Sequence, residues 1–413
     1  MRKNKKLNGW NMLAVISLQF VAQTSFIVNA VLANIAEAYP DVPYSLILMC
    51  STVTALVSIP SVLVSGFLAG RYVKYRTISI ITIALVCLVG IIPYFTDSFT
   101  ALFASRIIVG ICLGMTQPFT ESLIIMLFDK EKQAFLQGIG LSVENTSGII
   151  FQFLAGILCV YSLKYVWLLH LLQAVTLVLV IFFLPEPKHV EREKDKPLGI
   201  SDMKIPFKVH LEAAGFGIMW IFVYPLLLQQ SSIIMEFNIG TSVLAGAVGS
   251  AYTIGGFCAG LAFGKVYEIG KRKTIPVCLV LQILILLVFA TTSTGWVLIA
   301  CSALTGVMIF TIYATVFMDF ARVLKIWNRS QGKMDEESEG DGANIATSAF
   351  NIWLNVGAFG ATLFITGVYR IFRTTNPRIP LYVGAAVVTV ITVIWTAMII
   401  KDKKEEKALG FTE

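Results

Sequence analysis

Long apolar runs separated by short polar turns recur along the whole chain. A hydrocarbon core about 30 Å thick takes roughly 20 apolar residues in a helix, and about twelve runs reach that length. No segment alternates apolar and polar residues over about ten positions, as the strands of a membrane β-barrel do. The pattern therefore predicts an all-α membrane protein. We expect its helices to begin near Trp10, Tyr44, Thr77, Phe99, Ala134, Tyr165, Val209, Ser242, Thr274, Gly295, Ala343 and Leu381.

Composition agrees with this class. Of the 413 residues, 56% are hydrophobic and 14% are charged, and the mean hydropathy is +0.78. Soluble domains contain roughly a quarter charged residues, so the sequence excludes an ordinary soluble domain. The seven cysteines are dispersed in apolar runs without metal-type or redox-type spacing, and we interpret them as packing residues.

Cations gather in every second loop. With the N-terminus inside, the positive-inside rule places MRKNKK, Arg71 to Arg76, the Glu186 to Lys196 linker, the Lys325 to Asp341 loop and KDKKEEK in the cytoplasm. The opposite loops AEAYPDVP, TDS and TTSTG contain few cations or none, although YRIFRTTNPR near Arg370 is an exception. No cleavage site ends the first apolar run, so we expect an uncleaved span. The net charge of +7 thus reflects topology, with both termini cytoplasmic, and not a nucleic-acid surface.

The chain also repeats itself. A polar connection from Pro185 separates about six spans from about six, which predicts an N-terminal half at residues 1–184, a cytoplasmic linker at 185–205 and a C-terminal half at 206–413. Glycines four residues apart let helices approach closely, so we expect them at helix contacts. These glycines are Gly66, Gly70, Gly110 and Gly114 in the first half, and Gly260 and Gly264 in the second, where Gly306 also echoes Gly110.

Three motifs resemble the major facilitator superfamily. The loop from Gly66 to Arg76 resembles the family's signature loop between helices two and three, RIIVGICLG (Arg106 to Gly114) resembles its fourth-helix motif, and LPEP (Leu184 to Pro187) resembles the exit of its sixth helix. With the length, span count and repeat, the resemblance covers the whole chain. It implies two six-helix halves, in which helices one, four, seven and ten line a central cavity that opens alternately to each side.

The signature loop departs from the family pattern at two positions. Gly70 stands where an acidic residue is usual, and Val73 replaces a later glycine. Arg71 would therefore act alone in gating, or only as a topological anchor. The cations of this loop can also hydrogen-bond carbonyls at helix ends.

Charges inside the membrane are costly unless they are paired or face water. Arg106 lies about 10 Å and Glu144 about 15 Å into their spans, from opposite sides. We expect them to form an ion pair or a proton-linked pair, in which Glu144 is protonated in one conformation and paired in the other. Alternatively, Arg106 bonds backbone carbonyls and Glu144 satisfies it statically.

Further polar residues lie on the spans that the family uses for its cavity. Arg106, Gly110, Gly114, Gln117 and Glu121 share one helix face, which we expect to look into the cavity, with Glu121 a coupling residue or an interfacial one. Gln23, Gln117, Tyr224 and Tyr313 are the candidate substrate residues. His170 is expected at the interface, and Asp319 is expected to pair with Arg322.

These features predict a secondary active transporter of a small organic solute in a bacterial cytoplasmic membrane, coupled to protons. We expect it to be monomeric, without a metal or cofactor. The alternatives are an uncoupled facilitator and a drug/proton antiporter, although the fifth span lacks the Gly-Pro motif of such antiporters. The sequence contains neither an HExxH pair nor a Walker loop, which argues against a zinc enzyme and against an ATP-driven pump. The absence of a dense cation cluster favours a neutral, amphipathic or singly charged substrate.

Overall fold

The computed structural model describes residues 8–70, 72–187, 206–330 and 336–408. Within these ranges the chain is helical, apart from one isolated bridge between Ala69 and Val73. Eleven helices of the described part are long and apolar enough to cross a membrane, and one of them, Ser242–Thr291, consists of two helices joined by a 3-10 turn. The predicted all-α membrane class is confirmed, whereas the count of about twelve spans and the cytoplasmic termini stay predictions.

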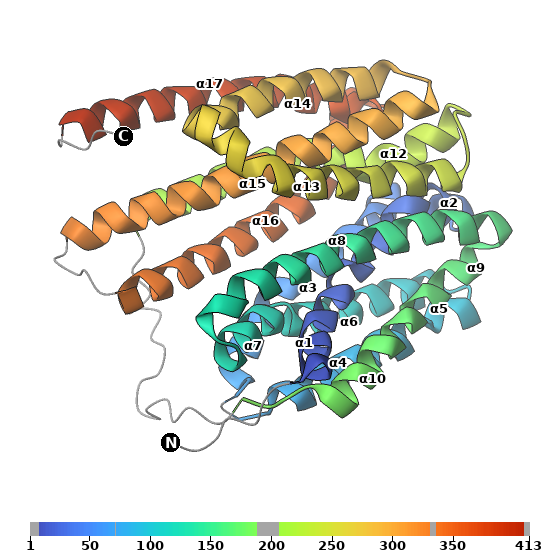
Figure 1. The fold of residues 1–413 in the computed structure, drawn as a ribbon. Coiled ribbons are helices and arrows are strands. Elements are labelled where there is room, and N and C mark those ends of the chain that lie inside the picture. Colours follow the sequence, from blue (N-terminus) through green and yellow to red (C-terminus); the bar gives the residue numbers. More distant parts are fainter. Residues whose placement is uncertain (1–7, 71, 188–205, 331–335, 409–413) are drawn as a thin grey trace. The chain divides into compact units, whose positions relative to one another are not determined.

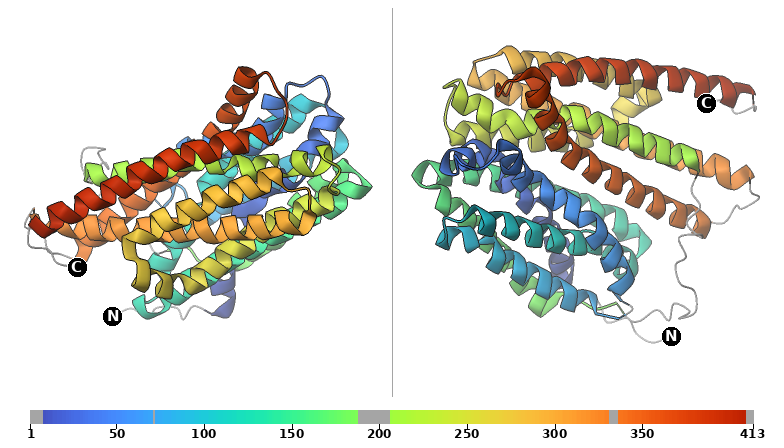
Figure 2. Two further views of the ribbon diagram at one scale, coloured as in Figure 1. Left: turned by 90° about the horizontal axis from the view of Figure 1, so that it is seen from above. Right: turned by 180° about the vertical axis from the view of Figure 1, so that it is seen from behind.

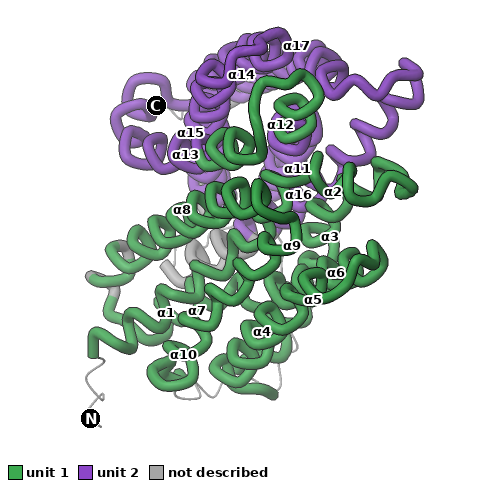
Figure 3. Tube along the Cα trace, turned by 90° about the vertical axis from the view of Figure 1, so that its right-hand side faces the viewer, with its two compact units in different colours: residues 1–195, 230–250 green, residues 196–229, 251–413 purple. Residues whose placement is uncertain are grey.

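The chain divides into two compact units, shown in green and purple in Figure 3. Unit 1 consists of residues 1–195 and 230–250, and unit 2 consists of residues 196–229 and 251–413. Residues 230–250 belong to unit 1 because they bond its helices. The Tyr44 hydroxyl lies 2.7 Å from that of Ser232, and Ser242 donates to the Gly156 carbonyl at 2.8 Å.

Most helices of unit 1 are interrupted. The main ones run side by side as Figures 1 and 2 show, with α3 packed along α6. Its core lies among α1, α4, α7, α8 and α10, around the buried residues Val15, Leu123 and Val180. The elements are α1 (Gly9–Ala22), η1 (Gln23–Ile27), η2 (Asn29–Val31), α2 (Leu32–Ala38), α3 (Tyr44–Leu68), α4 (Tyr75–Gly90), α5 (Ile92–Phe95), α6 (Phe99–Thr116), α7 (Phe119–Leu127), α8 (Lys130–Tyr161), α9 (Leu163–Val166), η3 (Trp167–Leu172) and α10 (Gln173–Phe183).

Unit 2 contains longer continuous helices. The neighbouring helices α14 and α17 lie side by side in Figure 1. Its elements are α11 (Phe207–Val223), α14 (Thr274–Thr291), α15 (Gly295–Ser330), α16 (Glu336–Phe372), α17 (Ile379–Ala408) and the turn η5 (Lys271–Lys273), while α12 (Pro225–Glu236) and α13 (Ser242–Gly270) each contribute to both units.

Three of the predicted substrate residues stand at helix breaks. Gln23 is the C-cap of α1, Gln117 that of α6 and Tyr224 that of α11. Pro118 and Pro225 follow the last two of these caps, and proline cannot donate the backbone hydrogen bond that would continue a helix. Discontinuous helices are typical of the binding regions of secondary transporters.

The glycines of the sequence motifs fall into two groups. A Cβ on Gly110 would lie 2.6 Å from the Thr54 Cα, and one on Gly114 would lie 2.7 Å from the Ser58 Cα, so α6 touches the α3 backbone at both glycines. Gly306 meets the α13 backbone in the same way, which agrees with its echo of Gly110 in the sequence.

The structure corrects the packing role at four positions. Gly66, Gly260 and Gly264 have no described atom within 4 Å of a built Cβ, because they lie on faces of α3 and α13 that no other described element covers. Gly70 has φ +73° and its amide donates to the Val73 carbonyl at 2.9 Å, so this glycine forms a tight turn and not a helix contact.

Candidate coupling and substrate residues

The structure brings Gln23 and Glu144 together inside unit 1. The Gln23 Nε2, at the break between α1 and η1, donates to the Glu144 Oε1 on α8 at 2.7 Å, and both side chains are half-buried. No Lys, Arg or His of the described part contacts the Glu144 carboxyl. Glu121, exposed on α7, is near enough to repel it electrostatically. Glu144 is therefore a carboxyl within a membrane span that is partnered by a neutral amide.

Arg106 lies elsewhere in unit 1 and is fully buried. Its NH2 group lies 3.2 Å from the His170 Nε2, its Nε lies 3.4 Å from the Ser105 hydroxyl, and its guanidinium stands 5.1 Å from the centre of the Trp167 ring. Because a guanidinium only donates, the His170 Nε2 accepts; the Nδ1 then carries the proton and donates to the Trp167 carbonyl at 3.0 Å. The buried guanidinium is thus held by a neutral histidine.

Two predictions about this region need correction. Arg106 and Glu144 are not paired in this conformation, since each has the other partners described above. His170 is not interfacial, because it is fully buried and its ring fills the space that the absent side chain of Gly90 leaves on α4. No periodicity in the sequence signals this contact, since Arg106 and His170 lie on different spans.

The predicted cavity stripe on the fourth span is also interrupted. Gly110 and Gly114 face α3, while Gln117, directly before Pro118, and Glu121, after it, are exposed. The stripe is divided between two helices, because α6 ends at Thr116 and α7 begins at Phe119. Only Gln117 and Glu121 of this stripe remain candidates for contact with a solute.

Tyr224 and Tyr313 belong to one aromatic cluster of unit 2. The centre of the Tyr224 ring lies 5.0 Å from that of Trp220. The ring of the half-buried Tyr313 has its centre 4.8 Å from that of Phe317 and 4.9 Å from that of Phe350. The spacing of three or four residues along α11 and α15 is the signal that could have predicted the cluster. Its other members are Phe216, Tyr252, Phe310 and Phe320.

A group of six charged side chains in unit 2 was not predicted as a whole. Arg272 on η5 contacts Glu212, Asp319 and Asp402, which lie on α11, α15 and α17. The expected pair of Asp319 with Arg322 is present at 3.4 Å, but the closer partner of Asp319 is Arg272, at 2.7 Å. Lys208 completes the group through Asp402 at 2.8 Å.

The signature loop is anchored at the start of α4. Arg76 donates to the Ile181 carbonyl, so a loop cation does bond a carbonyl at a helix end. The Glu186 carboxylate, from the LPEP motif, accepts the backbone amides of Tyr75 at 2.9 Å and Arg76 at 3.0 Å. Arg71 itself lies outside the described residues.

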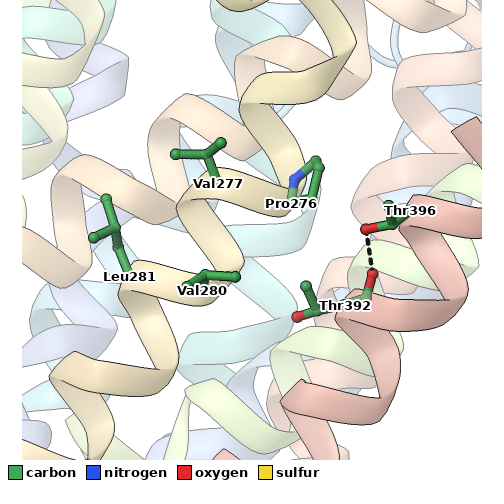
Figure 4. Close-up of a pocket in the computed structure, with 6 residues that line it drawn as sticks. All are labelled: Pro276, Val277, Val280, Leu281, Thr392 and Thr396. Carbon is green, nitrogen blue, oxygen red and sulfur yellow. Dashed lines mark hydrogen bonds between the residues drawn. The ribbon is translucent and has the colours of Figure 1, made fainter.

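An apolar groove of about 320 Å³ lies between α14 and α17 (Figure 4). Its polar lining groups are Thr392 and Thr396, whose hydroxyls donate to backbone carbonyls of their own helix, at 2.7 Å in both cases. Val277 and Val280 on its wall are more than half or about half exposed, at 58% and 50%. A surface of this kind suits lipid chains and offers no directed contact to a polar solute. The described residues also contain no group of three side chains placed to hold a metal ion.

The comparisons with known proteins concern the whole chain. A family model described as Major Facilitator Superfamily matches residues 12–362. No curated protein matches the sequence. Among solved structures, a mutant of the nucleoside transporter NupG is similar at 11% identity and TM-score 0.75, covering 95% of this chain and 100% of the other. A bacterial homologue of the human lysosomal transporter Spinster, solved inward-facing and occupied, is similar at 14% identity and TM-score 0.69, covering 97% and 98%. At these identities the likeness shows the fold alone.

Proposed function

The chain belongs to the major facilitator superfamily, and from this premise we propose that it is a proton-coupled secondary transporter that moves a small organic solute by alternating access. The proposal places it in a bacterial cytoplasmic membrane as a monomer with both termini in the cytoplasm. Glu144 carries the proton. Gln23, Gln117, Tyr224 and Tyr313 contact the solute.

The hydrogen bond between Gln23 and Glu144 is the observation that carries the proposal. An ionised carboxylate inside a membrane is costly unless a cation or water compensates it, and here its partner is a neutral amide. A protonated carboxyl avoids that cost, and it can still accept the Gln23 hydrogen bond. If the opposite conformation gives Glu144 water or a cation, it releases its proton there, and the proton gradient then biases the two conformations.

Arg106 enters the proposal as the second coupling residue. It is a buried cation of the same unit, and among the described residues its NH1 group has no hydrogen-bond partner and no carboxylate contacts it. Exchange of its His170 contact for an acidic partner would compensate a deprotonated carboxyl. Glu121 is proposed as the exposed acid through which protons reach Glu144, and Arg71 as a gating cation of the signature loop.

The solute we propose is neutral, amphipathic or singly positively charged. Arg106 is enclosed by α3, α6 and η3, and the remaining candidates are amides, tyrosines and the two acids Glu121 and Glu144. A multiply phosphorylated solute would require several cations. The aromatic cluster around Tyr313 suits an apolar or planar portion of the molecule.

The test is proton flux into proteoliposomes that contain the purified protein, followed with an internal pH dye while solutes are added one at a time. We expect one class of solute to change the internal pH, and Glu144→Gln to abolish this change. Ser142→Ala on the same helix is the matched control, since the Ser142 hydroxyl donates to the backbone of its own helix, and this variant should keep the pH change. Solute entry without any pH change, in the wild type as in Glu144→Gln, would instead establish an uncoupled facilitator.

A further inference from the structure

Six charged side chains meet where α11, η5, α15 and α17 come together in unit 2. We call this group the Arg272 cluster; it consists of Lys208, Glu212, Arg272, Asp319, Arg322 and Asp402. Arg272 is at its centre, with its side chain 9% exposed. The proposed transport mechanism does not use any of these residues.

The three carboxyl groups of the cluster are not equally compensated. Asp319 accepts from the Arg272 Nε at 2.7 Å and also has Arg322 at 3.4 Å. Asp402 accepts from the Arg272 NH2 and from Lys208, both at 2.8 Å. Glu212 has only a longer contact of 3.3 Å to the same NH2 group that Asp402 engages, and its Oε2 has no hydrogen-bond partner.

The buried cations of the cluster compensate its two buried acids unequally. Glu212 and Asp319 are 4% and 3% exposed and share the guanidinium of Arg272. The buried Nε of Arg322 lies 3.4 Å from the Asp319 Oδ1, whereas Lys208 is 33% exposed, so solvent screens its charge. Two buried carboxylates that share one guanidinium repel each other, and such a pair lowers its energy by retaining one proton.

We propose that Glu212 is a proton-binding site, which holds a proton in this conformation while Asp319 and Asp402 are ionised around Arg272. The proton resides on Glu212 because this carboxyl has the longest contact to Arg272, and because its Oε2 has neither a hydrogen bond nor an ion pair among the described residues. The Asp319 Oδ1 also lacks a hydrogen bond, but Arg322 lies 3.4 Å from it, and a neutral unpartnered group costs less than a charged one. The charged groups around Glu212 are Lys208 from its own helix, Arg272 from η5, Asp319 and Arg322 from α15, and Asp402 from α17, which shares the Arg272 NH2 with it.

The site makes the stability of unit 2 depend on pH in a definite direction. Near neutral pH, Glu212 keeps its proton in the folded unit, whereas in the unfolded chain it is an exposed glutamate that has already released its proton. Stability is therefore greatest at low pH and falls as the pH rises and Glu212 loses its proton. This inference does not rest on the proposed function, and it needs no substrate for its test.

The first test is the melting temperature of the purified full-length protein in detergent, from about pH 5 to about pH 9. We expect the wild type to lose several degrees on the alkaline side. Glu212→Gln, which mimics the protonated form, should melt like the wild type at low pH and lose little at high pH. Asp319→Asn is the matched control, because it removes an equally buried carboxyl that is the closest partner of Arg272. It should lower the melting temperature at every pH.

Equal destabilisation by Glu212→Gln and Asp319→Asn at every pH would show that Glu212 is ionised and would overturn the proposal. If Glu212→Gln does not fold, infrared spectra of the Glu144→Gln variant test whether Glu212 is protonated, because that variant removes the other carboxyl proposed to hold a proton. A protonated-carboxyl band that titrates away at alkaline pH is expected. Absence of the band in this folded variant would also contradict the proposal.

Discussion

At the scale of single residues, unit 1 contains a buried guanidinium, that of Arg106, which has no carboxylate partner among the described residues. Arg106 is enclosed by His170, Trp167 and Ser105, and the histidine must be neutral to accept its hydrogen bond. The burial of a cation costs free energy that hydrogen bonds and the aromatic face offset only in part. The His170 acceptor therefore contributes directly to the stability of unit 1.

We predict that His170→Phe destabilises the protein, because it keeps an aromatic ring but removes the acceptor of the Arg106 NH2. Loss of a hydrogen bond to a buried charged group costs about 1–3 kcal/mol, so the melting temperature in detergent should fall by several degrees. His170→Gln can still accept through its amide oxygen and should lose less. Equal melting temperatures for His170→Phe and the wild type would show that the contact contributes nothing.

The sequence singles out candidate residues but does not identify their partners. Glu144 is a candidate because it is a charge within an apolar span, and Gln23 because it lies on a span that the family uses for its cavity. The hydrogen bond between them depends on the rotation of two separate helices. Periodicity assigns a residue to a face of its own helix and does not say which neighbour that face meets. The contact of Arg106 with His170 and the Arg272 cluster were missed for the same reason.

At the scale of secondary-structure elements, hydropathy located the helices but not their interruptions. The predicted start near Thr77 compares with Tyr75 in the structure, and Phe99 and Gly295 are identical. The breaks after Gln117 and Tyr224 do not lower the local apolarity, so a search for apolar runs passes over them. Pro118 and Pro225 are the sequence signal that marks both breaks.

At Gly110, α6 packs directly against the backbone of α3. Gly110→Leu should disrupt folding, because its side chain would meet the Thr54 backbone, which cannot move aside as a flexible side chain could. We expect a large loss of monodisperse protein in size-exclusion chromatography. Gly260→Leu is the matched control, since nothing described lies within 4 Å of its Cβ, and it should behave as the wild type does. If both variants behaved alike, α6 would not require a glycine at the contact.

At the scale of the whole molecule, the sequence repeat and the contacts in the structure divide the chain differently. The internal repeat predicts halves at 1–184 and 206–413, whereas contacts assign residues 230–250 to unit 1. The repeat reflects similar helices in corresponding positions, such as those of Gly110 and Gly306, while contacts reflect one conformation. Membership of the major facilitator superfamily agrees with the repeat, and an alternating transporter is expected to exchange such contacts during its cycle.

The most direct test of proton coupling at Glu144 is the accumulation of a transported solute in proteoliposomes under an imposed pH gradient. We predict uphill accumulation by the wild type, which stops when the gradient is dissipated. Glu144→Gln should fail to accumulate the solute yet still exchange labelled for unlabelled solute at equal concentrations. Uphill accumulation that persists in Glu144→Gln would contradict the account, because the proton would then bind elsewhere.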